Sequence, residues 1–240
     1  MARIHITLQG KGGVGKSYIS SLLAQHLIES GREVVCIDTD PVNKTFHQYR
    51  AFPVEPLEIL DGTRVNERNF DRLMEILLTR QGEEFIIDNG ASSFIPLSNY
   101  LIENQAVELL AEHGHEVVVH TVVTGGQALL DTLNGFRSVV TQFVEGTRII
   151  VWLNEYFGAV AAEGKDFEKM KVYTEHRERV TGLIRLKQLS ADTYGRDVEE
   201  MLNRKLTFDE AIGHGEFALM AKQRLKMVKR ALWEQMALMG

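Results

Sequence analysis

The sequence predicts an α/β fold of three layers, in which a doubly wound, mostly parallel sheet of about seven strands lies between two layers of helices. Two observations lead to this fold class. Short apolar runs alternate with segments of helical periodicity along nearly the whole chain. Several of the runs are almost continuously apolar, which is typical of parallel strands that are buried on both faces.

The expected strands follow one another at intervals that leave room for crossover helices. Residues 3–8 alternate with a period of two, and the later strands are expected in the apolar runs at 33–38, 85–88, 117–123, 149–153 and 180–186. Residues 44–65 are expected to be irregular, because Pro53 and Pro56 would break a long helix.

Segments of helical periodicity supply the expected helices. Apolar residues recur at helical spacing from Ile19 until Gly31, and again within 70–77 and 129–140. A charged segment at 164–178 is also expected to be helical. After the last strand the pattern predicts helices at 194–204, 207–213 and 216–237.

The composition is typical of a soluble globular protein, and we expect a single domain over residues 1–240. Of these residues 44% are hydrophobic, 25% are charged and four are prolines. The chain enters its first strand directly, without a signal peptide, and no apolar run approaches the length of a membrane span, so we expect a cytoplasmic protein. The net charge of −6 argues against a protein that coats nucleic acid with its whole surface, although it allows a local basic patch.

The sequence between the first strand and the first helix fits the phosphate-binding pattern G-x-x-x-x-G-K-[ST]. Its glycines allow backbone N–H groups to turn toward a polyphosphate. Lys16 supplies a positive charge for the β- and γ-phosphates, and Ser17 supplies a hydroxyl for Mg²⁺. We therefore expect a nucleotide site formed by Gly10, Lys11, Gly12, Gly13, Val14, Gly15, Lys16, Ser17 and Tyr18.

Acidic residues stand where two of the expected strands end. Asp38 and Asp40 follow one strand, and Asp88 follows another. Because ligands of open α/β sheets bind beyond the carboxyl ends of the strands, these acids should face the glycine-rich loop. Asp88 is expected to hold Mg²⁺ through water. Asp38 and Asp40 compete for the role of positioning a water molecule, with Asp38 better placed to support Mg²⁺ or Ser17; an ordinary Asp-x-Asp-Pro turn is the alternative.

Residues 11–17, Lys-Gly-Gly-Val-Gly-Lys-Ser, resemble the deviant Walker A motif of the MinD/ParA branch of P-loop ATPases. The resemblance implies an ATPase that binds ATP or ADP with Mg²⁺ and forms a homodimer in the ATP state. It also implies that Lys11 reaches across the dimer interface to the partner's nucleotide. Residues 38–41 resemble the first switch of that family, whose acid before proline orients the attacking water, and residues 88–91 resemble its Walker B acid and second switch.

The same resemblance assigns roles to the site residues. Catalysis falls to Lys11, Lys16 and Asp40, and the metal to Ser17, Asp38 and Asp88. Asn154 resembles the asparagine that reads the adenine edge, although a strand-end cap is the alternative. Where the family has a proline-containing loop near the base, this chain has 187–190, Lys-Gln-Leu-Ser. The contacts to the base are therefore unassigned, and ATP rather than GTP is implied by the family alone.

Longer segments resemble a group of these ATPases that is carried by IncP-type conjugative plasmids. The matching segments are 37–43, 87–94, 121–131 and 193–197. The resemblance implies a role in conjugative plasmid transfer, with a protein of the conjugation machinery as a partner.

The expected C-terminal helix is basic. Residues 216–240 carry five positive and two negative side chains, a net charge of +3. One side of the helix is expected to hold Phe217, Met220, Val228, Leu232 and Met236, and the basic residues are Lys222, Arg224, Lys226, Lys229 and Arg230. Such a helix could lie on the inner membrane, contact the phosphates of plasmid DNA, or pack on the sheet with its basic face in water.

Together these observations predict a Mg-ATP-dependent, dimerising ATPase switch. One alternative is a small-molecule kinase or amide ligase on the same scaffold, which would need a polar clamp near the γ-phosphate that we cannot assign in the sequence. The other is a nucleotide-binding scaffold protein with negligible turnover, against which the presence of both Lys11 and Asp40 argues.

Overall fold

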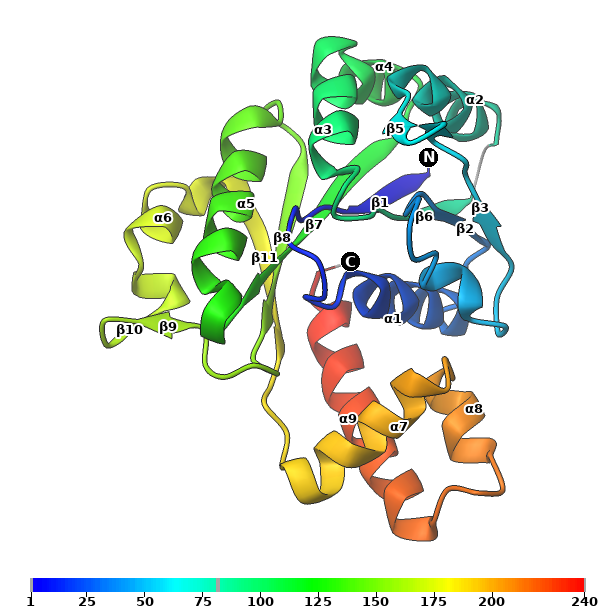
Figure 1. Cartoon of the computed structure of the whole chain (residues 1–240), viewed down its shortest axis with the longest axis vertical. Helices are drawn as coiled ribbons and strands as arrows, with labels where there is room; N and C mark the ends of the chain where they lie inside the picture. The colour runs from blue at the N-terminus through cyan, green and yellow to red at the C-terminus, as the bar shows by residue number, and fades with distance from the viewer. Residues whose placement is uncertain (1, 81–82, 240) are drawn as a thin grey trace.

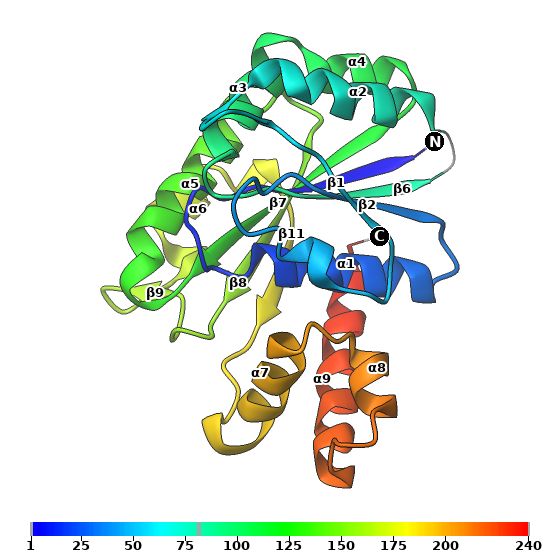
Figure 2. The ribbon, with the colours of Figure 1, turned by 45° about the vertical axis from the view of Figure 1, so that its right-hand side comes forward.

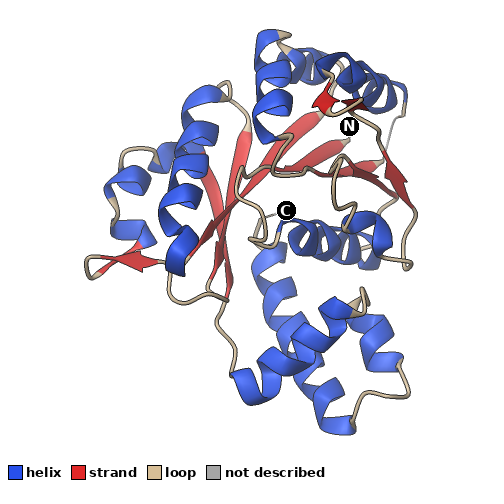
Figure 3. Ribbon diagram, in the orientation of Figure 1, coloured by secondary structure: helices blue, strands red, loops and turns tan. Residues whose placement is uncertain are grey.

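The computed structural model describes residues 2–80 and 83–239. Residues 1, 81, 82 and 240, which fall within the expected domain 1–240, lie outside the described residues. The centre of the structure is a sheet of seven strands in the order β11-β8-β7-β1-β6-β2-β3, drawn in red in Figure 3. All of its strand pairs are parallel, which confirms the predicted α/β fold class.

The elements alternate along the chain. The strands of the main sheet are β1 (Arg3–Thr7), β2 (Val34–Asp38), β3 (Val54–Pro56), β6 (Glu84–Asp88), β7 (Glu116–Thr124), β8 (Arg148–Asn154) and β11 (Val180–Leu186). The helices are α1 (Lys16–Glu29), α2 (Phe70–Thr79), α3 (Phe94–Glu103), α4 (Ala106–Glu112), α5 (Leu129–Gln142), α6 (Lys171–Thr174), α7 (Arg196–Asn203), α8 (Phe208–Gly213) and α9 (Leu219–Ala237). Two small hairpins pair β4 (Leu60–Asp61) with β5 (Arg64–Val65) and β9 (Ala161–Ala162) with β10 (Lys165–Asp166).

Helices cover both faces of the sheet, as the continuous apolar strands predict. Successive side chains of a strand point to opposite faces, so Ile86 and Ile87 of β6 belong to two different apolar clusters. The cluster of Ile87 includes residues of α2, α3, α4 and α5, and the cluster of Ile86 includes residues of α1, α7, α8 and α9. Figures 1 and 2 show these two groups of helices on either side of the sheet.

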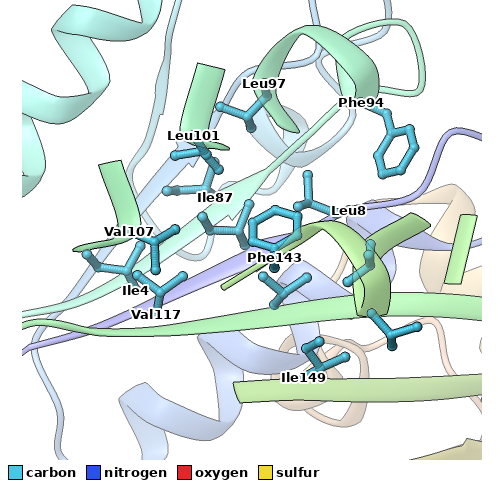
Figure 4. Packing of buried hydrophobic residues seen from close by; sticks show 14 of the residues in the cluster. Ile4, Leu8, Ile87, Phe94, Leu97, Leu101, Val107, Val117, Phe143 and Ile149 are labelled. Atoms are coloured by element: carbon cyan, nitrogen blue, oxygen red, sulfur yellow. The ribbon is translucent and has the colours of Figure 1, made fainter. Parts of the chain in front are cut away.

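The core on the first face is built from strand residues that meet α3 and α4. Ile4, Ile87 and Val117 come from three neighbouring strands and pack near Leu101 and Val107 (Figure 4). All five side chains are at most 7% exposed. This packing fixes the sheet from which the functional loops emerge.

Three adjacent strands end at the same level. In the register of the sheet, Asp88 at the end of β6 lies beside Thr7 at the end of β1 and beside Asp38 at the end of β2. The loop after β1 and the acids after β2 and β6 therefore emerge at one edge, as the sequence predicts.

The structure corrects several expected elements. Residues 44–65 are not wholly irregular, because they contain β3, an edge strand of three residues in which prolines are tolerated. The charged segment 164–178 is mostly not helical: α6 covers four residues, and β10 and short 3₁₀ turns take most of the rest. Helices α3 and α4 occupy a stretch in which the sequence pattern predicts no element.

Candidate nucleotide-binding site

The glycine-rich loop joins β1 to α1. Gly13 has a φ of 73° and Gly15 a φ of 98°, values in the left-handed region that side chains other than glycine rarely adopt. Gly15 is the N-cap residue directly before α1, so the loop leads into a helix N-terminus, whose free N–H groups favour anions. The local geometry is that of a phosphate-binding loop.

Lys16 is held inside this loop. The residue is 8% exposed, and its Nζ donates a hydrogen bond to the Lys11 carbonyl oxygen at 3.0 Å. Burial lowers the pKa of Lys16, while the nearby charges of Asp88 and Asp40 act in the opposite direction. The ammonium group therefore lies between the glycine-rich loop and the acids of the neighbouring strands.

Asp88 is buried at the end of β6. Its Oδ1 accepts hydrogen bonds from Thr7 Oγ1 at 3.0 Å and from Ser20 Oγ at 2.9 Å. Burial raises its pKa to about 6, and the charge of Asp38 contributes to the rise. The hydroxyl of Ser17, the second residue of α1, acts in the opposite direction. A buried carboxylate among hydroxyl groups is a set of oxygen donors that fits a hard cation such as Mg²⁺.

Asp38 shares this edge of the sheet with Asp88. Its carboxylate accepts the backbone N–H groups of Asp40 and His47, each at 2.9 Å. Burial raises its pKa, although these two hydrogen bonds favour the ionised form. The carboxylate thus braces the loop that follows β2 as well as facing the site.

Asp40 caps a turn in its own loop. Its Oδ1 accepts the backbone N–H groups of Val42 at 2.9 Å and of Asn43 at 3.1 Å. The loop after β6 lies against it, because a Cβ at Gly90 would be 2.8 Å from Asp40 Cγ and 3.0 Å from Asp40 Cα. The two segments that resemble switches are therefore in direct contact.

The side chain of Lys11 is about half-exposed. Its Nζ forms an ion pair of 2.7 Å with Oδ2 of Asp131, in the first turn of α5. The sequence alone assigns no role to Asp131, and no signal in it joins two residues that are 120 positions apart. Because both side chains are largely exposed, the ion pair contributes little to stability.

Asn154, at the end of β8, is bonded to the loop. Its Nδ2 donates to the Val14 carbonyl oxygen at 2.9 Å, and its Oδ1 accepts the backbone N–H of Tyr156 at 3.1 Å. The side chain therefore ties the glycine-rich loop to the end of β8.

A cavity of about 1160 Å³ opens beside the loop. Gly13, Gly15, Tyr18 and Asn154 line one side, and Leu186–Leu189 with parts of α7 and α9 line the other. The cavity also includes Tyr156 and Phe157, to which the sequence alone assigns no role. The signal in the sequence that could have pointed to them is that two adjacent aromatic residues follow shortly after a strand-end asparagine.

Two basic residues of α9 form ion pairs with acidic residues of other segments of the chain. Arg224 Nε bonds to Asp197 at 2.5 Å, and Lys229 Nζ bonds to Asp209 at 2.7 Å and to Glu29 at 3.0 Å. Phe217, just before the helix, and Leu232 and Met236 on it are buried as expected, whereas Met220 is 60% exposed, so its expected place on the apolar side is wrong. Within residues 2–80 and 83–239, none of the helices combines the length and apolar character needed to cross a bilayer.

Comparisons with known proteins identify the family. The family model described as the CobQ/CobB/MinD/ParA nucleotide binding domain matches residues 6–202. Two Escherichia coli proteins, each described as Protein TraL, are 52% identical to the chain over 236 residues, 98% of each chain. The chain also aligns with the solved structure of the septum site-determining protein MinD of Pyrococcus horikoshii, which was determined with Mg-ADP. The alignment covers 100% of this chain and 99% of MinD, with a TM-score of 0.54 and 15% identity. The two proteins therefore share the same fold. The chain belongs to the CobQ/CobB/MinD/ParA nucleotide-binding family.

Proposed function

We propose that this chain is a Mg-ATP-dependent ATPase switch that dimerises when ATP is bound and acts in conjugative plasmid transfer. The observation that carries the proposal is the meeting of the glycine-rich loop with Asp38 and Asp88 at the ends of adjacent strands. Membership of the nucleotide-binding family supports the ATP site. The identity of 52% to Protein TraL supports the role in plasmid transfer.

The residues at this edge fit Mg-ATP. The conformations of Gly13 and Gly15 and the start of α1 suit a polyphosphate, and Lys16 brings positive charge to it. Ser17, Asp38 and Asp88 would hold Mg²⁺, directly or through water. When bound, Mg²⁺ would neutralise the negative charge that develops on the phosphates.

Catalysis would depend on rearrangements of Asp40 and Lys11. Asp40 would give up the N–H groups of Val42 and Asn43 in order to orient the attacking water. Lys11 would leave Asp131 in order to reach the nucleotide of a second copy, where it adds positive charge as an arginine finger does. Both changes reshape the loops around the γ-phosphate, which is how P-loop switches alter their binding surfaces.

The partner would recognise the ATP-bound dimer. We propose a protein of the conjugation machinery, plasmid DNA or the inner-membrane surface as candidates, and a cytoplasmic location in each case. Arg224 and Lys229 of α9 have acidic partners within the chain, and Arg230 lies 3.9 Å from Glu234. A DNA or membrane contact through this helix would therefore rely mainly on Lys222 and Lys226.

Release of phosphate from Mg-ATP tests the proposed activity. Asp40→Ala should lower turnover by about 10²- to 10⁴-fold and leave ATP binding intact, whereas Lys16→Ala should lose binding. Asp166→Ala, which changes an exposed carboxylate in β10, is the control and should match the wild type. Wild-type turnover no faster than that of Lys16→Ala would contradict the proposal and favour the scaffold alternative.

A further inference from the structure

Two adjacent aromatic side chains are exposed beside the glycine-rich loop. Tyr156 is 60% exposed and Phe157 is 52% exposed. Their rings meet edge to face, with centroids 4.8 Å apart and an interplanar angle of 90°. Both residues line the cavity that includes Gly13 and Gly15. Because these rings are largely outside the core, their burial does not explain their presence.

Close backbone packing holds this aromatic segment in place. A Cβ at Gly125 would be 2.2 Å from the Gly158 carbonyl oxygen, and a Cβ at Gly126 would be 2.8 Å from that of Phe157. The residue before the pair, Glu155, forms an ion pair of 2.7 Å with Arg185. The segment is thus fixed on two sides before any ligand binds, which reduces the entropy that binding would cost.

The side chain of Asn154 joins the aromatic segment to the glycine-rich loop. Its Oδ1 accepts a hydrogen bond from Tyr156 N, and its Nδ2 donates one to the Val14 carbonyl oxygen. The amide keeps a second lone pair on its oxygen and a second N–H on its nitrogen, so these two bonds leave it able to contact the edge of a base.

We propose that Tyr156 and Phe157 form an aromatic platform, beside Asn154, on which the purine base of the nucleotide stacks. This inference rests on the proposed nucleotide binding. Stacking on an aromatic ring tolerates any base, because every base has a π-face. Stacking on the platform therefore does not by itself distinguish adenine from guanine nucleotides.

Calorimetric dissociation constants for Mg-ATP, Mg-GTP and inorganic tripolyphosphate, which lacks a base, test the platform. The variant with both Tyr156→Ala and Phe157→Ala should bind the two nucleotides about 5- to 100-fold more weakly and tripolyphosphate as well as the wild type does. Tyr156→Phe keeps the ring and should keep the affinity. Asn154→Ala should weaken tripolyphosphate as well as the nucleotides, because the Asn154 side chain is bonded to the Val14 carbonyl oxygen of the loop that holds the phosphates.

The outcomes separate the platform from the proposed function. Leu219→Ala, which truncates an exposed apolar side chain on α9, is the matched control and should bind like the wild type. If the wild type binds neither Mg-ATP nor tripolyphosphate, the proposed function fails. If it binds Mg-ATP and the double variant binds it equally tightly, the platform is overturned while the proposed function stands.

Discussion

At the scale of single residues, Asp88 is a carboxylate that the fold shields from water. It is 1% exposed, and its polar neighbours include the hydroxyl groups of Thr7, Ser17 and Ser20 and the charges of Asp38 and Lys16. Burial of a carboxylate disfavours its charged form. Ionisation of Asp88 therefore lowers the stability of the folded protein.

Asp88→Asn should stabilise the nucleotide-free protein at pH 8 by about 1–3 kcal/mol. The pKa of Asp88 is about 6 in the folded protein and 3.8 in an unperturbed side chain. The folded state therefore binds this proton more tightly, and the stability associated with Asp88 falls as pH rises from about 4 to 6. Denaturant unfolding at pH 8 and pH 4.5 should show the advantage of the Asn variant shrinking at the lower pH. An Asn variant less stable than the wild type at pH 8 would contradict this reasoning.

The residues that the sequence could predict are those whose roles a motif defines. Lys16, Asp38 and Asp88 lie together because the motif and the strand ends define their places before the fold is known. Asp131 and Tyr156 receive no role from a motif and meet their neighbours only after α5 and β8 have packed. Sequence spacing contains no information on the ion pair of Lys11 with Asp131, and the exposure of the aromatic pair beside the glycine-rich loop emerges only from the structure.

At the scale of elements, the loops after β2 and β6 act as one unit. Gly90 leaves no room for a side chain, because a Cβ at this position would lie within 3.0 Å of three atoms of Asp40. A movement of either loop therefore changes the position of the other. This contact gives a direct route from β6 to the residue proposed to hold the attacking water.

Gly90→Ala should lower ATP turnover at least tenfold by displacing Asp40, a loss of about 1.4 kcal/mol in transition-state stabilisation. Binding of ADP should remain, because the glycine-rich loop is untouched. Gly213→Ala, at a position where a Cβ would meet nothing within 4 Å, is the control and should keep full turnover. Normal phosphate release by Gly90→Ala would show that the two loops move independently.

The elements also show where sequence patterns were insufficient. Strand β3 has three residues and ends in Pro56, so it lacks the length and alternation that identify a strand. In α3, Pro96 lies in the first turn, where a missing N–H is tolerated, although a proline usually suggests a break.

A row of buried, hydrogen-bonded polar side chains crosses three strands of the sheet, and the apolar pattern of these strands does not predict it. His5 Nδ1 lies 2.9 Å from His120 Nε2, and Trp152 Nε1 donates to His120 Nδ1 at 3.0 Å. Burial keeps the pKa of His120 well below its ordinary value. These hydrogen bonds link β1, β7 and β8 through side chains as well as through the backbone.

At the scale of the whole molecule, the fold class was predictable because it depends on the order of elements and not on their exact bounds. Alternating apolar runs and helical segments suffice to predict a parallel sheet between two helical layers. The relation of α7, α8 and α9 to the sheet was not predictable. These helices gather beyond α1 in Figures 1 and 2, held by contacts such as Lys229 with Glu29 that join distant segments.

We propose that ATP brings two copies together through Lys11, and the most direct test is the molecular mass in solution. Light scattering with ADP, and then with ATP and Mg²⁺, should be measured on the wild type, Lys11→Ala and Asp40→Ala. For the wild type we predict about twice the chain mass of 27.2 kDa with ATP and the monomer mass with ADP. Lys11→Ala should keep the monomer mass with either nucleotide. Asp40→Ala should form a persistent dimer with ATP, because it should bind ATP without hydrolysing it. A monomer mass for the wild type and Asp40→Ala in every nucleotide state would contradict the account.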